Sequence, residues 1–136
     1  MDDTTALHGL ADALTANAGD LDADLDWFSR VLEARLKGYF GAQGAPREDP
    51  LAIAPPALEG SRSTYAQFVC ENRLAPSARL VVLLALIPHV RPQLLDVLWS
   101  RNDVTQRGFT EFGGMQGSSH GGFIPTGETA VFLLAG

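Results

Sequence analysis

Cysteine is nearly absent from this chain. Cys70 is the only one among 136 residues, so no internal disulfide can form and a reducing compartment is favoured. Its apolar position in a helical pattern predicts a small buried side chain rather than a nucleophile. The longest hydrophobic run, residues 80–87, is far shorter than the ~20 residues that span a bilayer. The N-terminus also lacks the basic segment of a secretory signal. We therefore expect a cytoplasmic protein that does not contact a membrane.

Basic residues are scarce as well, with ten Lys and Arg against sixteen Asp and Glu and a net charge of −6. Nucleic-acid binding depends on Lys and Arg, so this balance argues against a nucleic-acid partner. The acidity is concentrated in residues 1–60, which hold eleven acidic and four basic side chains. Residues 61–136 hold five and six. The length suits one domain with a sizeable core.

Sequence patterning divides the chain into three regions. Residues 1–40 are predicted to form an acidic N-terminal helical arm, with a first helix that ends near Gly19. Residues 41–60 hold four prolines and three glycines, which predicts an extended linker. Residues 61–136 are predicted to form a helical body. Its expected helices cover 61–74, 77–90, 91–100 and a C-terminal segment capped by Thr126. Residues 80–87 of the second are apolar all round, which predicts a central core helix.

Residues 103–124 are rich in glycine, and we expect them to form a short β-hairpin or a glycine-rich loop. Strands are predicted within 104–112 and a mobile loop over 113–122. The predicted fold class is thus mainly α, a small helical domain. Three short helices followed by a hairpin-like segment also resemble the order of a winged-helix domain. In that alternative the chain is a module that binds nucleic acid or a transcription partner.

The segment 122–129 reads G-F-I-P-T-G-E-T and approaches a nucleotide-binding loop. Glu128 stands where that loop needs the lysine that meets the phosphates, and Pro125 removes a backbone donor. No strand is predicted before it. Thr126 and Glu128 are better explained as groups that cap a helix N-terminus. We therefore expect no nucleotide site here.

Two further patterns resemble metal or catalytic sites but have simpler explanations. The spacing of an EF-hand loop is matched by Asp22, Asp24, Asp26 and Glu33. Trp27 stands where that loop needs glycine, and an acidic first turn of a helix fits better. The three histidines lack the spacing of metal ligands. The serines beside His120 lack the pattern of a nucleophile elbow. A small hydrolase that uses His120 is kept as a third alternative. No catalytic residue, cofactor or metal is expected in this chain.

The glycine-rich segment carries side chains that suit a protein interface, where aromatic residues and Met are enriched. The candidate partner-contact residues are Phe109, Phe112, Met115, His120 and Phe123. The alternative is that these side chains anchor the segment on the core.

Several unusual strings occur in a fixed order in the body. They are an apolar run that ends in Pro88-His89, "RPQLLDV" from Arg91, "RGFTEFGG" from Arg107 and "HGGFIPTGETAVFLLAG" from His120. Over roughly residues 62–136 they resemble the N-terminal region of bacterial AAA+ ATPases associated with phage-tail-like contractile injection systems. The first sixty residues match less distinctly.

This resemblance implies a non-catalytic domain that recognises partner or substrate proteins or aids assembly. Its partners would be injection-system components or the ATPase core. The Walker A and Walker B motifs, and with them ATP and Mg²⁺, would lie beyond Gly136 in a full-length relative. Any oligomer would form through that full-length ATPase.

Overall fold

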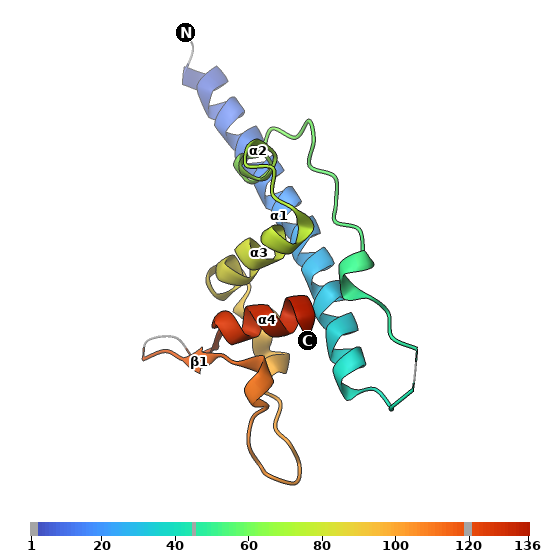
Figure 1. Cartoon of the computed structure of the whole chain (residues 1–136). Coiled ribbons are helices and arrows are strands. Elements are labelled where there is room, and N and C mark those ends of the chain that lie inside the picture. The colour runs from blue at the N-terminus through green and yellow to red at the C-terminus, as the bar shows by residue number, and fades with distance from the viewer. Residues whose placement is uncertain (1–2, 45, 119–120) are drawn as a thin grey trace.

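The computed structural model describes residues 3–44, 46–118 and 121–136. The fold is mainly helical with one small antiparallel hairpin, which confirms the predicted fold class. The elements, with η for a 3₁₀-helix, are α1 (Asp3–Phe40), η1 (Pro50–Ala52), α2 (Thr64–Glu71), α3 (Pro76–Val90), η2 (Pro92–Trp99), η3 (Thr110–Phe112), β1 (Met115–Gln116), β2 (Phe123–Ile124) and α4 (Gly127–Ala135). Figure 1 shows α1 running the length of the molecule with the other helices packed across it.

A single helix, α1, replaces the two helices predicted for residues 1–40. A glycine inside a helix costs about 1 kcal/mol. At Gly19 this cost is offset because Asn17 bonds to α2 and Leu21 packs against the core. The second half of α1 supplies part of the core, whereas its first half projects beyond the body (Figure 1). Residues 1–40 and 61–136 therefore share one core.

Residues 41–44 and 46–63 form an irregular segment that carries η1 and runs back along α1 (Figure 1). Asp49 caps η1 by accepting a bond from the Leu51 amide at 3.0 Å. The Trp27 indole donates to the Ile53 carbonyl at 2.9 Å, and Leu58 is buried. The linker is therefore held on α1 by side-chain bonds as well as by apolar contacts.

The four predicted helices of the body are present as α2, α3, η2 and α4. Ser63 caps α2, and Pro76 occupies the first turn of α3, where a missing N–H costs nothing. The prediction that α3 lies at the centre is supported by its buried residues. These are Arg79, Leu80, Leu83, Leu84 and Ile87. One difference concerns Cys70, which is exposed on the outer face of α2 and not buried as expected.

The strands predicted within 104–112 are wrong. That stretch forms a turn, closed by a bridge between Arg101 and Gly108, and then η3. The hairpin lies further along, where β1 pairs with β2 in antiparallel register, and β1 falls in the segment expected to be a loop. Phe112 reaches the core from η3, and Phe109, the residue before η3, packs against the core.

Within the described ranges, no single helix is long and apolar enough to cross a bilayer. Together α3 and η2 have the length and composition for it, but they meet at a bend of 102°.

Candidate functional site

The residues predicted to contact a partner lie in different environments. Phe112 and Phe123 are 0% exposed, so the structure corrects their assignment to a contact surface. Phe109 is partly buried against the core, and Met115 is 56% exposed. His120 lies outside the described residues. Of the four described candidates, Met115 is therefore the side chain most available to a partner.

Aromatic stacking explains why the others turn inward. Phe112 and Phe132 of α4 have ring centres 4.6 Å apart, and Phe109 packs edge-on against Tyr39 at 5.8 Å. On the other side of the hairpin, Phe123 meets Trp99 at 4.9 Å. These contacts support the anchoring alternative, because such pairs stabilise beyond the area they bury.

Two glycines at the root of the hairpin permit this packing. Gly113 and Gly114 have φ angles of 64° and 85°, a region that favours glycine. A Cβ on Gly114 would lie 2.2 Å from the Phe123 ring, and one on Gly113 would lie 2.6 Å from the Thr126 hydroxyl. The glycine-rich composition therefore serves close packing at this point.

The segment that approaches a nucleotide-binding loop is occupied by its own side chains. Thr126 caps α4, and its amide donates to the Thr129 hydroxyl at 3.1 Å. The Thr126 hydroxyl accepts from the Gly114 amide at 3.0 Å and also bonds to Glu128 at 3.3 Å. A carboxylate and a filled cap therefore stand where a phosphate would need free N–H donors. This geometry supports the predicted capping role of Thr126, whereas the reciprocal cap is made by Thr129 and Glu128 accepts a bond from the Thr126 hydroxyl in the first turn.

A buried ionic cluster that the sequence analysis missed lies where α1, α2 and α3 meet. Asp24 is 0% exposed and accepts bonds from Arg79 Nε at 2.8 Å, from Arg79 Nη2 at 2.5 Å and from the Tyr65 hydroxyl. Arg79 also donates to the Pro56 carbonyl at 2.7 Å. Its guanidinium lies 5.3 Å from the centre of the Trp27 ring. No buried side-chain nitrogen or oxygen of the described residues lacks a hydrogen-bond partner, which is what burial of charge requires.

Burial raises the pKa of the Tyr65 hydroxyl well above its usual range, and the hydrogen bond to Asp24 raises it further. Burial alone lowers the pKa of Arg79, but the Asp24 carboxylate outweighs this effect and the net shift is upward. Both shifts stabilise a neutral tyrosine and a charged arginine. The cluster therefore fixes the helices in place, and the raised pKa values of Tyr65 and Arg79 do not suit these two groups to proton transfer at neutral pH.

The acidic run at 22–26 lies in the middle of α1, not in its first turn as predicted. Asp24 points into the core, whereas Asp22 forms an ion pair with Arg91 at 2.6 Å and is largely exposed. Since residues 22–33 are helical throughout, the calcium-loop alternative is excluded. One signal was available: Arg79 lies in a strongly apolar helix, where a charge needs a buried partner.

A second set of polar contacts attaches the start of α2 to α1. Asp20 accepts bonds from the Ser61 and Ser63 hydroxyls, each at 2.5 Å. Asn17 accepts from the Tyr65 amide at 2.9 Å. These bonds set the position of α2 along α1.

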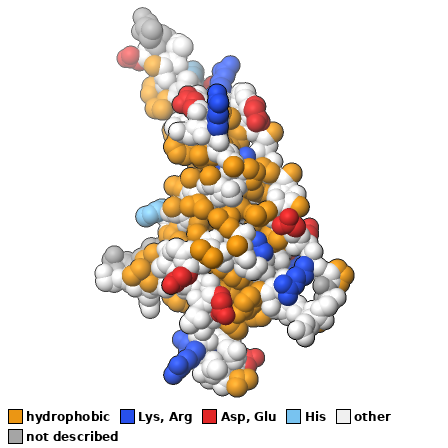
Figure 2. Space-filling model, viewed as in Figure 1, with side chains coloured by type: hydrophobic (Ala, Val, Ile, Leu, Met, Phe, Trp, Pro, Cys, Tyr) orange, Lys and Arg blue, Asp and Glu red, His pale blue; other side chains and the backbone are white. Residues whose placement is uncertain are grey.

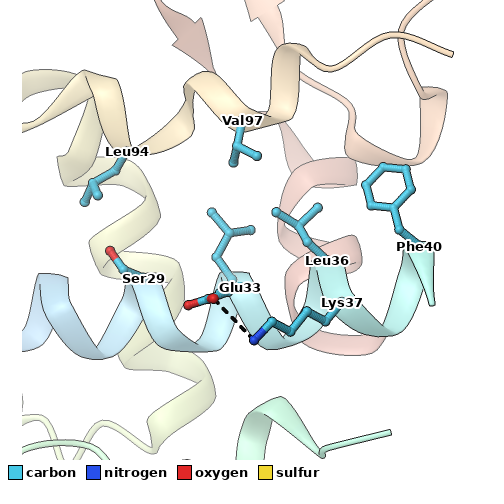
Figure 3. A pocket seen from close by; sticks show the side chains of 8 residues that line it. Ser29, Glu33, Leu36, Lys37, Phe40, Leu94 and Val97 are labelled. Atoms are coloured by element: carbon cyan, nitrogen blue, oxygen red, sulfur yellow. Dashed lines mark ion pairs between the residues drawn. The ribbon is translucent and has the colours of Figure 1, made fainter. Parts of the chain in front are cut away.

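An apolar groove of about 410 Å³ opens between the C-terminal half of α1 and η2. We call it the α1–η2 groove; it is lined by Ser29, Leu32, Glu33, Leu36, Lys37, Phe40, Leu94 and Val97. Figure 3 shows Leu94 and Val97 pointing from η2 toward α1, with Leu94 opposite Ser29. The ion pair between Glu33 and Lys37, at 3.3 Å, lies on α1 at the edge of the groove.

The size of the α1–η2 groove falls within the range of small-molecule and side-chain pockets. Its walls are leucine, valine and phenylalanine, and Phe40 and Val97 are 53% and 45% exposed. Figure 2 shows that hydrophobic side chains also make up much of the face turned to the viewer, interrupted by isolated charges. Side chains that hold a metal do not gather anywhere in the described ranges: no group of three or more His, Cys, Asp and Glu is suited to it.

Comparison of the chain with known protein families, curated proteins and solved structures finds no match. The resemblance of residues 62–136 to the N-terminal region of AAA+ ATPases therefore rests on their sequence strings alone.

Proposed function

We propose that this chain is a non-catalytic N-terminal domain of a AAA+ ATPase that serves a contractile injection system. In this proposal the domain recognises partner or substrate proteins, or helps the ATPase assemble. The order of the strings in residues 62–136 supports the family. The structure adds that these strings occupy packed positions, since the phenylalanines of "RGFTEFGG" and "HGGFIP" anchor the hairpin.

The observation that carries a binding role is the α1–η2 groove. Leu36 and Phe40 on one wall and Val97 on the other leave apolar surface in contact with water. Water is displaced favourably from such surface by apolar side chains of a partner. The shape fits the helix-in-groove mode, in which the apolar face of an amphipathic partner helix inserts its side chains.

ATP hydrolysis would take place in a different domain. The N-terminus of α4, which resembles a phosphate loop in sequence, is capped by Thr126 and carries Glu128 beside it. Repulsion between this carboxylate and a polyphosphate opposes nucleotide binding. The role left to the domain is to bring a protein partner to the machine.

The binding role is tested with the purified chain and the injection-system proteins encoded beside its gene, by titration calorimetry. Val97→Lys places a charge in the groove and should abolish binding to the protein that the domain recognises. Val104→Lys is the matched control, because Val104 is 91% exposed and does not line the groove. Equal affinity of both variants and the unaltered chain would remove the groove from the proposal, and no binding to any of these proteins would contradict the proposed function.

A further inference from the structure

The projecting N-terminal end of α1, residues 3–16, carries an apolar stripe that no other described segment covers. We define the stripe by Leu7, Leu10 and Leu14, which are 66%, 57% and 62% exposed. Spacings of three and four residues place these leucines on one face of the helix. Hydrophobic side chains are visible on this projecting end in Figure 2.

The stripe continues the face of α1 that packs on the body. Leu21, Leu25, Phe28 and Leu32 follow Leu14 at spacings of seven, four, three and four, and all of them lie in or against the core. Residues 3–16 extend this face by about 20 Å, at 1.5 Å per residue. The projecting end of the helix therefore exposes the same apolar face that packs into the core further along α1.

The residues that flank the stripe are small and uncharged. Alanines border it at 6 and 13 on one side and at 11 and 18 on the other. Asp12 and His8 are the ionisable residues between Thr4 and Gly19, and they lie about 170° and about 130° around the helix from the stripe. Small flanking residues let two helices approach closely. Like charges along the edges of a helix–helix contact would repel an identical helix. No acidic or basic side chain borders the stripe, so no such repulsion disfavours a second copy.

We propose that two copies of this chain associate through the stripe, as an antiparallel pair of the first halves of α1. A parallel pair would set both Asp3 carboxylates and both positive helix N-termini side by side. The antiparallel pair separates them and leaves the two bodies at opposite ends. Two stripes of three leucines bury less than the ~1,200 Å² typical of stable complexes, so the dimer is weak. This inference does not depend on the proposed function.

Sedimentation equilibrium of the 136-residue chain over a wide concentration range tests the association. The expected result is a monomer–dimer equilibrium that Leu10→Asp abolishes at concentrations where the unaltered chain is half dimeric. Thr5→Asp is the matched control, since Thr5 is exposed on the opposite face of the same helix, and it should leave the equilibrium unchanged. Circular dichroism of both variants verifies that the body remains folded.

Spin labels on chains that carry Thr5→Cys and Cys70→Ser distinguish the two orientations. The antiparallel pair separates the labels by roughly 16 Å along the helix axis, whereas a parallel pair brings them to the same level. A chain that stays monomeric, a dimer that survives Leu10→Asp, or labels at the same level would overturn the proposal. So would a monomer whose stripe is covered only when a different protein is added.

Discussion

The buried cluster around Asp24 makes a strong prediction about stability. Asp24→Ala removes the carboxylate that accepts both bonds from Arg79, while the guanidinium stays buried with the Pro56 carbonyl and the Trp27 ring as its remaining contacts. Breaking one side of a buried ion pair costs about 3–5 kcal/mol, because the other charge is left without its partner. Small domains have a total stability of about 5–15 kcal/mol, so this loss approaches unfolding.

Asp22→Ala is the matched control, two residues away on the same helix. Its ion pair with Arg91 is exposed, with 65% of the Asp22 side chain accessible. Exposed pairs contribute about 0–1 kcal/mol. Each substitution removes one aspartate side chain from α1. The difference between their losses of unfolding free energy therefore isolates the effect of burial.

Urea unfolding followed by circular dichroism at neutral pH measures both free energies. We expect a loss of about 3–5 kcal/mol for Asp24→Ala and less than about 1 kcal/mol for Asp22→Ala. Arg79→Ala and the double variant complete a cycle with a coupling energy of about 2–3 kcal/mol. Similar losses for both single variants would refute the reasoning, because burial would then not decide the strength of these pairs.

Three more predictions follow from the hairpin, the capped helix and the buried tyrosine. Gly114→Ala should lower the melting temperature markedly, because the added Cβ would overlap the Phe123 ring. Gly121 has open space around it, so Gly121→Ala should leave the melting temperature unchanged. Thermal unfolding measures both. Glu128→Lys completes the phosphate-loop motif, yet we expect no ATP binding by calorimetry because the donors at the start of α4 stay capped. The raised pKa of Tyr65 implies stability that is complete below its unfolded pKa of about 10 and is lost as the pH rises above it. Tyr65→Phe should therefore flatten the fall in urea stability in alkaline solution, and an unchanged fall would contradict this assignment.

The helical body was predictable because its signals are local. Pro76 marks the start of α3, Thr126 the start of α4, and the uniform apolar character of residues 80–87 identifies the central helix. Each depends on residues within a few positions of one another, which is the range that periodicity and capping report.

The course of α1 and the buried cluster were not predictable in the same way. Whether a helix passes through Gly19 depends on what Asn17 and Leu21 contact in three dimensions, and those partners lie far along the chain. The pair of Asp24 and Arg79 joins residues 55 positions apart. Periodicity shows which residues face inward, but it does not show which charges meet there.

The predicted contact residues illustrate the same limit. Aromatic residues and Met between glycines suit either an interface or an anchor, and composition alone leaves the two open. Burial of Phe112 and Phe123 favours the anchor for both. The α1–η2 groove was not anticipated, because it combines residues of α1 with Leu94 and Val97 of η2, which lie far away in the sequence.

The assignment to an ATPase is tested most directly by the reading frame that follows Gly136. We predict a glycine-lysine phosphate loop and, further along, an acidic Walker B strand. A stop codon directly after Gly136, or a continuation without these motifs, would contradict the proposed function.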